Sequence, residues 1–174
     1  FRNRTLGISK DNLDFINKDI IKINKKLFWS IKKIEIFTEK NRDEKILEFK
    51  NQNIELFFMT KYENIYNLIN SNLKKNKLFK KILIKDNKFY KNIFKKKEFN
   101  LIFNCESNND IYKKFFHNSI KKDYNSSAYS FIINHNKTKN TKASQIFTKL
   151  GPIAFLPISK NQTSVVFSKK NEKF

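Results

Sequence analysis

The sequence is poor in residues that bend or crosslink a chain: its 174 residues include two glycines, two prolines and one cysteine. A single cysteine excludes an internal disulfide framework and suits a reducing cytoplasm. Two glycines cannot build the Gly-x-Gly-x-x-Gly loop that cradles a dinucleotide. No apolar run approaches the ~18 residues of a membrane-spanning helix. The chain begins at Phe1 without a signal-peptide core, so we expect a fragment of a longer protein.

Three of the four glycines and prolines lie in one stretch, Gly151–Ile158. Gly151 can take positive φ at little cost, and Pro157 cannot donate to a sheet. The stretch is therefore predicted to be a strand that lies at an edge or ends near Pro157. Thr163–Ser168 is predicted to be the next antiparallel strand.

The net charge of +21 by itself indicates a nucleic-acid or anionic-membrane partner. The lysines, however, are scattered over every segment. Arginine, which nucleic-acid binders use for phosphate and base contacts, occurs only at Arg2, Arg4 and Arg42. We therefore interpret the lysine excess as the result of AT-rich codon usage, which also favours Asn, Ile and Phe. No specific nucleic-acid partner is expected.

Apolar residues at helical spacing predict two helices, over Lys10–Asn24 and Lys61–Lys75. Ser9 is the expected N-cap of the first helix. Thr60 and Glu63 form a capping-box pattern at the start of the second.

Strands are predicted where apolar and polar residues alternate, as Ile34 and Ile36 do with Lys33 and Glu35. The other predicted strands are Lys45–Lys50, Ile54–Met59, Leu78–Ile84, Phe89–Phe94, Phe99–Asn104 and Tyr124–His135. A short helix over Ile111–Phe116 is expected to begin at Asn109 or Asp110.

Several linked patches follow one another in the C-terminal part: Tyr124 with Ala128, Ala143 with Phe147, Gly151-Pro152-Ile153-Ala154-Phe155-Leu156-Pro157, and Ser164-Val165-Val166-Phe167-Ser168. In order and spacing they resemble the middle of the ubiquinone-biosynthesis hydroxylases. Those enzymes belong to the FAD-dependent aromatic hydroxylases, the class of p-hydroxybenzoate hydroxylase.

The resemblance implies an α/β (α+β mixed) protein, with a Rossmann-like FAD-binding domain interleaved with a mixed β-sheet substrate domain. Residues 1–26 and 53–121 would belong to the FAD-binding domain. Residues 27–52 would form a substrate-domain hairpin, and 122–174 the substrate-domain sheet. The implied reaction is monooxygenation of an aromatic ring of a polyprenylated ubiquinone precursor, with FAD, NAD(P)H and O2. The implied location is cytoplasmic, with peripheral association at the inner membrane or with a ubiquinone-biosynthesis complex.

The same resemblance implies site residues but no catalytic acid or base. Expected cofactor-binding residues are Arg4, Lys61, Tyr62 and Glu106. Glu106 stands where the family's Ala-Asp-Gly-x-x-Ser loop has Asp, although Ser107 replaces its Gly and Asp110 its Ser. Expected substrate-pocket residues are Gly151, Pro152, Phe155 and Pro157.

Two other interpretations stay open. The charge and the many aromatic residues allow a basic nucleic-acid-binding module, and the altered loop at 104–110 allows a non-catalytic relative. His117 and His135 lack the companion ligands of a metal site, so no metal is expected.

Overall fold

The computed structural model describes residues 4–41, 44–50, 55–84, 89–90, 92, 99–106, 109–116, 118, 120 and 122–171. It is a mixed α/β structure dominated by strands in two sheets. The chain divides into two compact units. Unit 1 comprises Phe1–Asn76 with Asn125–Phe174, and unit 2 comprises Lys77–Tyr124. None of the described helices is long and apolar enough to cross a membrane.

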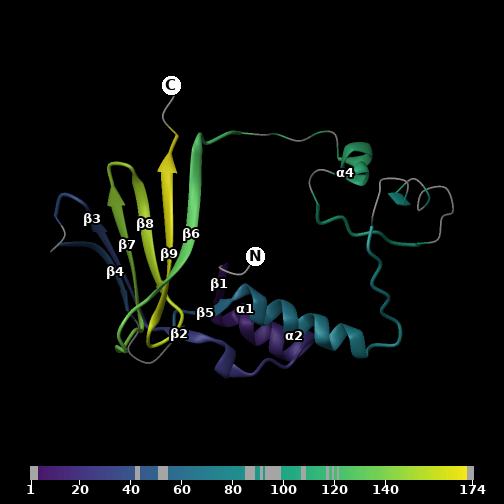
Figure 1. The fold of residues 1–174 in the computed structure, drawn as a ribbon, viewed down its shortest axis with the longest axis horizontal. Helices are drawn as coiled ribbons and strands as arrows, with labels where there is room; N and C mark the ends of the chain where they lie inside the picture. The colour runs from purple at the N-terminus through teal and green to yellow at the C-terminus, as the bar shows by residue number, and fades with distance from the viewer. Residues whose placement is uncertain are drawn as a thin grey trace. The chain divides into compact units, whose positions relative to one another are not determined.

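The smaller sheet of unit 1 has three strands in the order β1-β5-β2, and both pairings are antiparallel. Two helical segments follow its strands directly along the chain (Figure 1). The elements are β1 (Thr5–Ser9), α1 (Lys10–Phe15), the π-helical η1 (Ile16–Ile20), the 3-10 helix η2 (Lys25–Leu27), β2 (Trp29–Ile31), β5 (Phe57–Lys61) and α2 (Tyr62–Lys75).

The larger sheet has six strands in the order β4-β3-β7-β8-β9-β6, with β3 and β4 at one side and β6 at the other (Figure 1). Only the β3–β7 pairing is parallel. The strands are β3 (Lys33–Thr38), β4 (Lys45–Lys50), β6 (Ser126–Asn134), β7 (Lys142–Thr148), β8 (Gly151–Pro157) and β9 (Gln162–Lys170). The strands predicted from Gly151 and Thr163 are confirmed. The prediction that this strand ends near Pro157 is also confirmed. Gly151 has a positive φ of +136°, a conformation that glycine can adopt at little cost.

The first predicted helix forms, but it ends before Asn24. Ser9 caps it as predicted, because its Oγ accepts the Asn12 N–H at 3.3 Å. At the other end, the Asn17 amide donates to the Leu13 carbonyl at 3.0 Å and accepts the Ile23 N–H at 2.7 Å. A side chain that hydrogen-bonds to backbone groups competes with the hydrogen bonds of a continuing helix. The helical segment therefore ends with η1 at Ile20.

The second helix is confirmed from Tyr62 to Lys75, but the predicted capping box is wrong. Lys61 holds the N-cap position and makes no side-chain cap. Thr60 is instead a buried residue of β5, and its Oγ1 donates to the Leu27 carbonyl at 2.7 Å. A threonine with this tertiary partner satisfies its hydroxyl in the sheet instead of at the helix end.

Unit 2 contains the predicted short helix, α4 (Asp110–Phe115), and Asn109 caps it by accepting the Tyr112 N–H at 2.8 Å. The strands predicted over Leu78–Ile84 and Phe99–Asn104 are wrong, because these residues are irregular. Leu78 is 94% exposed, so the alternation of apolar and polar residues in this segment does not bury an apolar face against other elements. Most of the Phe89–Phe94 prediction lies outside the described residues.

The register divides the larger sheet into two faces, since successive side chains point to opposite sides. The inner face packs against the smaller sheet. There Ala143 joins Ile31 and Met59 in the buried core, and Leu156 packs against them. The outer face lies on the other side and carries Glu35.

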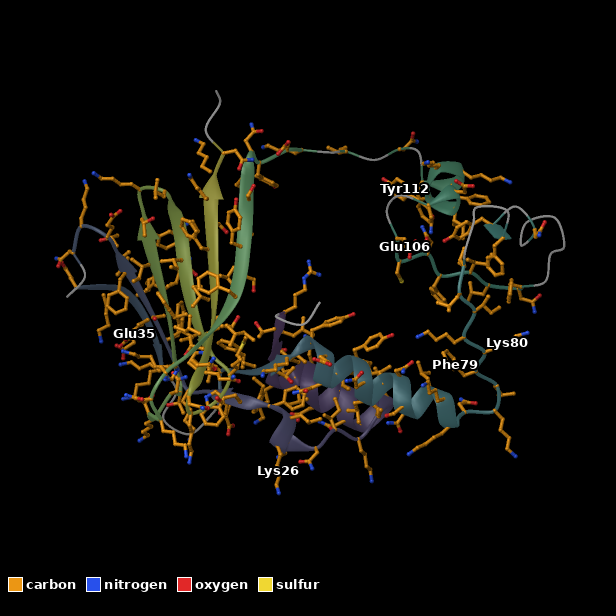
Figure 2. The ribbon with its side chains drawn as sticks, in the orientation of Figure 1. Lys26, Glu35, Phe79, Lys80, Glu106 and Tyr112 are labelled. Carbon is orange, nitrogen blue, oxygen red and sulfur yellow. The ribbon has the colours of Figure 1, made fainter. Side chains whose placement is uncertain are left out.

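Glu35 departs from the half-buried pattern predicted for its strand, because it is only 4% exposed. Figure 2 labels Glu35 on the larger sheet. Its carboxylate pairs with Lys33 and Lys142, each at 2.7 Å, and with Lys45 at 3.6 Å. Hydrogen bonds from Lys142 and then Lys33 lower the pKa of Glu35 to about 2, although burial acts in the opposite direction. Three lysine stems thus cover and neutralise one buried charge.

Candidate functional site

A cavity of about 400 Å³ lies in unit 1 where the smaller sheet meets the inner face of the larger sheet. This volume is in the range of small-molecule sites. Most of its walls are apolar, with a few polar groups. The lining residues are Arg4, Thr5, Leu6, Gly7, Phe57, Met59, Ser130, Leu156 and Val166.

The smaller sheet supplies one wall through the β1–β5 pairing, which sets Gly7 opposite Met59. A Cβ at Gly7 would lie 3.3 Å from Met59 Sδ and 3.4 Å from the Phe57 ring. Any larger residue at this position would therefore push into the two side chains that line the cavity. The absence of a side chain at Gly7 helps keep the space open.

The larger sheet supplies the other wall through residues that its register places together. Ser130 pairs with Val166 across β6 and β9, and Val166 pairs in turn with Ala154 of β8. Around them the inner face of these strands carries small residues, namely Ala128, Ala154, Ser164 and Ser168. Small side chains on one face of a sheet leave room above it, which explains why a cavity forms here.

A buried hydroxyl pair joins the two walls. Thr5 Oγ1 lies 2.8 Å from Ser164 Oγ, and Ser164 is fully buried. The same end of β1 is held by the Tyr62 N–H, which donates to the Arg4 carbonyl at 2.9 Å. Arg4, Lys61 and Tyr62 therefore converge at one corner, as Lys61 pairs with Thr5 in the sheet.

The polarity of the cavity suits a flat apolar molecule with one polar or anionic end. Arg4 is the only charged residue in the described lining, and its guanidinium can donate several hydrogen bonds in one plane. Thr5 and Ser130 add hydroxyl groups that can donate or accept. This arrangement can bind and orient a ring. The described lining contains no His, Cys, Asp, Glu, Lys or Tyr, the side chains that usually act as a general acid or base.

Of the predicted pocket residues, none lines this cavity. Phe155 and Pro157 lie on the outer face, while their neighbour Leu156 points to the inner face and lines the wall. Gly151 and Pro152 stand at the start of β8, where they pair with Thr148 and Phe147. Gly151 has a packing role, because a Cβ there would lie 1.9 Å from the Ser168 carbonyl oxygen.

Glu106, the remaining predicted cofactor residue, belongs to unit 2. It lines a separate cavity of about 300 Å³ with Asn104, Cys105, Tyr112 and Phe116. Asn104 organises this loop, as its amide donates to the Glu106 carbonyl at 2.9 Å and its Oδ1 accepts from Asn109 at 2.7 Å. Figure 2 shows Glu106 and Tyr112 near one another in this unit.

Both ring nitrogens of His135 lie within hydrogen-bonding distance of other groups of the chain. Its Nδ1 lies 2.8 Å from the Asn136 carbonyl, to which it donates, and its Nε2 lies 3.0 Å from Thr163 Oγ1. In the described part of the chain, no group of three His, Cys, Asp or Glu residues could hold a metal ion. His117 lies outside that part.

No protein-family model matches the sequence, and no curated protein is significantly similar to it. The link to the aromatic hydroxylases therefore rests on the motif residues between Tyr124 and Ser168.

Proposed function

We propose that this chain provides the pocket for the aromatic ring in a FAD-dependent monooxygenase that hydroxylates a polyprenylated phenol. The observation that carries the proposal is the cavity between β1 and the inner face of β8 and β9. It joins Arg4, an expected cofactor-binding residue, to Leu156, which belongs to the Gly-Pro motif.

The chemistry of the cavity fits a phenol. Its apolar walls, Leu6, Phe57 and Met59 among them, can pack on a ring and on the start of a prenyl chain. The Arg4 guanidinium and the Ser130 hydroxyl can hold a phenol or phenolate oxygen. Such a site can orient the ring.

The described residues do not make a site for the whole of FAD. The smaller sheet is antiparallel throughout, and neither Gly7 nor Gly151 lies in a loop that could cradle phosphates. A cavity of about 400 Å³ holds a ring system and not an entire dinucleotide. The contribution that we assign to this chain is therefore binding of the substrate ring.

The test is a titration of the full chain with a phenol that carries one short prenyl group. Trp29, the only tryptophan, packs against the Ile31–Met59–Ala143 core beside this cavity, so its fluorescence reports binding. We expect saturable binding that weakens about tenfold when the phenol is replaced by the same molecule without its hydroxyl group, since a buried polar contact is then lost. A linear, unsaturated response would overturn the proposal.

Two variants localise the binding. Ser130→Val adds bulk on the inner face at the cavity wall, whereas Ser144→Val adds the same bulk on the outer face of β7. Ser130→Val should abolish or strongly weaken binding, and Ser144→Val should leave it unchanged. Equal effects from the two variants would place the phenol elsewhere on the molecule.

A further inference from the structure

We propose that the free edge of β6 binds an extended acidic segment of another protein, which adds to the larger sheet as a further strand. The larger sheet ends at β4 on one side and at β6 on the other (Figure 1). An edge strand presents backbone N–H and C=O groups with which a further strand can pair. This inference concerns the edge of the sheet and does not rest on the proposed function.

The ladder between β6 and β9 shows which backbone groups of β6 face the free edge. At one end the His135 N–H donates to the Asn161 carbonyl at 2.9 Å, and at the other the Asn171 N–H donates to the Asn125 carbonyl at 2.7 Å. Hydrogen-bonded pairs alternate along an antiparallel ladder, so the odd-numbered residues of β6 bond to β9 and the even-numbered ones face away. The residues that face away are Ser126, Ala128, Ser130, Ile132 and Asn134. No described residue makes a backbone hydrogen bond to them at the free edge.

The two edges of the larger sheet differ in their protection against an added strand. β6 holds nine residues in unbroken register with β9 and contains neither a charged residue nor a proline. β4 is shorter and carries Lys45, Glu48 and Lys50, and its register with β3 shifts between Ile36 and Phe37. Charges and irregular register keep an edge strand from pairing. The β4 edge is therefore protected, and the β6 edge is open.

The side chains of β6 favour a segment with apolar residues at alternate positions. Tyr129, Phe131 and Ile133 lie on the outer face of the sheet and are 55%, 44% and 37% exposed. An added strand would bring its own side chains to about 5 Å from them. Aromatic and β-branched residues make favourable cross-strand pairs with such side chains. The centre of the segment should therefore alternate valine, isoleucine or aromatic residues with polar ones.

The charge at the two ends of β6 selects acidic ends for the segment. Residues 124–171 include seven lysines and no aspartate or glutamate, although the whole chain has 16 acidic residues. Lys169 and Lys170 lie where β9 pairs with the start of β6. Lys160 lies beside the loop that follows β6, since its carbonyl accepts the Thr138 N–H at 2.9 Å. Carboxylates at both ends of the segment would complement these lysines.

The same charges disfavour a second copy of this chain at the edge. If two β6 strands paired antiparallel about Ser130, the start of each strand would face the end of the other. Lysines at the start of one strand would then lie close to lysines at the end of the other, and a parallel pair would bring identical ends together. Like charges that face one another across strands are destabilising. An acidic segment avoids this repulsion.

The experiment is calorimetric titration of the full chain with the synthetic peptide Asp-Asp-Thr-Val-Thr-Val-Thr-Val-Asp-Asp. One control peptide has lysine in place of every aspartate, and the other is N-methylated at every central amide, so it cannot donate to a strand. The acidic peptide should bind saturably, and each control should bind at least about tenfold more weakly. Equal binding of either control, or no saturable binding of the acidic peptide, would overturn the proposal.

Amide exchange, measured residue by residue by NMR, tests whether the peptide occupies this edge. With the acidic peptide, the N–H groups of Ala128, Ser130 and Ile132 should exchange at least about tenfold more slowly. Those of Tyr129 and Phe131, which already bond to β9, should change little. Slower exchange at other sites without slower exchange at these three would place the peptide on another surface and refute the proposal.

A matched pair of variants tests the backbone contact. Ala128→Pro removes an N–H that faces the free edge and leaves the bonds to β9 in place, a position where edge strands tolerate proline. Ala128→Thr keeps the N–H and suits a strand. Binding should weaken at least about tenfold in the first and change less than about twofold in the second. Equal binding by the two variants, with folding verified by circular dichroism, would contradict strand addition.

A second matched pair tests the charge, and a last measurement tests the rival occupant. Lys169→Gln with Lys170→Gln should weaken binding more than Lys40→Gln with Lys50→Gln, which makes the same change in net charge at the β3–β4 side. Equal weakening would show that net charge alone attracts the peptide, against the proposal. If sedimentation velocity without peptide shows a dimer that Ala128→Pro dissociates, the edge binds a second copy and the proposal is wrong.

Discussion

Replacement of Gly151 by alanine tests the backbone geometry on which the motif strand depends. Gly151 has φ +136°, a region that residues with a side chain rarely adopt. An added Cβ would also lie 1.9 Å from the Ser168 carbonyl oxygen and 3.0 Å from its carbon. Both atoms belong to the backbone of β9, so no flexible side chain can move aside. The clash between the new Cβ and the Ser168 backbone can be relieved only if the ends of β8 and β9 move apart.

The expected cost follows from three contributions. Holding a non-glycine residue at this φ costs about 1–3 kcal/mol. Separation of the strand ends also weakens the neighbouring bond from the Lys170 N–H to the Leu150 carbonyl, at about 1 kcal/mol. Against this, alanine restricts the unfolded chain and returns about 0.4–1 kcal/mol. The free energy of unfolding should therefore fall by about 1–4 kcal/mol.

The assay is urea unfolding of the full chain followed by Trp29 fluorescence, which reports on unit 1. The matched control is Gly7→Ala, at the other glycine. Gly7 is outside the positive-φ region, and its new Cβ would meet the flexible Met59 thioether at 3.3 Å. That variant should change the free energy of unfolding by less than about 1 kcal/mol. Equal losses in the two variants would refute this account of Gly151.

Three further predictions concern charge, a hydrogen-bonding hub and the cofactor. The folded-state pKa of Glu35 lies below its unfolded value of 4.5, so its carboxylate stabilises the fold above that pH and the stabilisation disappears as the pH falls toward 2. In the Glu35→Gln variant, the loss of unfolding free energy between pH 4.5 and pH 2 should be smaller by up to about 3 kcal/mol, as measured by urea titrations at stepped pH. Asn140→Asp should cost about 1–3 kcal/mol in the same assay, because the Asn140 amide donates to the Ser159 carbonyl at 2.9 Å and contacts Thr163 Oγ1 at 3.0 Å; an unchanged midpoint would contradict that role. FAD should not bind tightly to the chain alone, and saturable submicromolar quenching of flavin fluorescence would show that a phosphate loop is not needed.

Local patterns were sufficient for several strands of unit 1, but β1 (Thr5–Ser9) and β7 (Lys142–Thr148) were not predicted as strands. The β3–β4 hairpin and the β8–β9 pair combine apolar residues in succession with turn residues between them, and both formed as predicted. The same reasoning failed over Leu78–Ile84, since an alternating segment becomes a strand only beside an edge that can accept it. It also failed at Thr60 and Asn17. There a tertiary partner or a side-chain bond to the backbone decided the local structure.

The position of the candidate cavity depends on which residues of β8 face inward, and β8 by itself cannot show this. Ile153 to Leu156 are all apolar, so Phe155 and Leu156 are equivalent candidates from their own strand. The neighbouring strand resolves the choice, because Ser164 pairs with Leu156 while Val165 pairs with Phe155. A serine inside an apolar strand needs a buried partner, and Thr5 provides it across the two sheets. Small and polar residues at alternate positions of adjacent strands therefore indicate the pocket face more reliably than the large apolar residues of the motif.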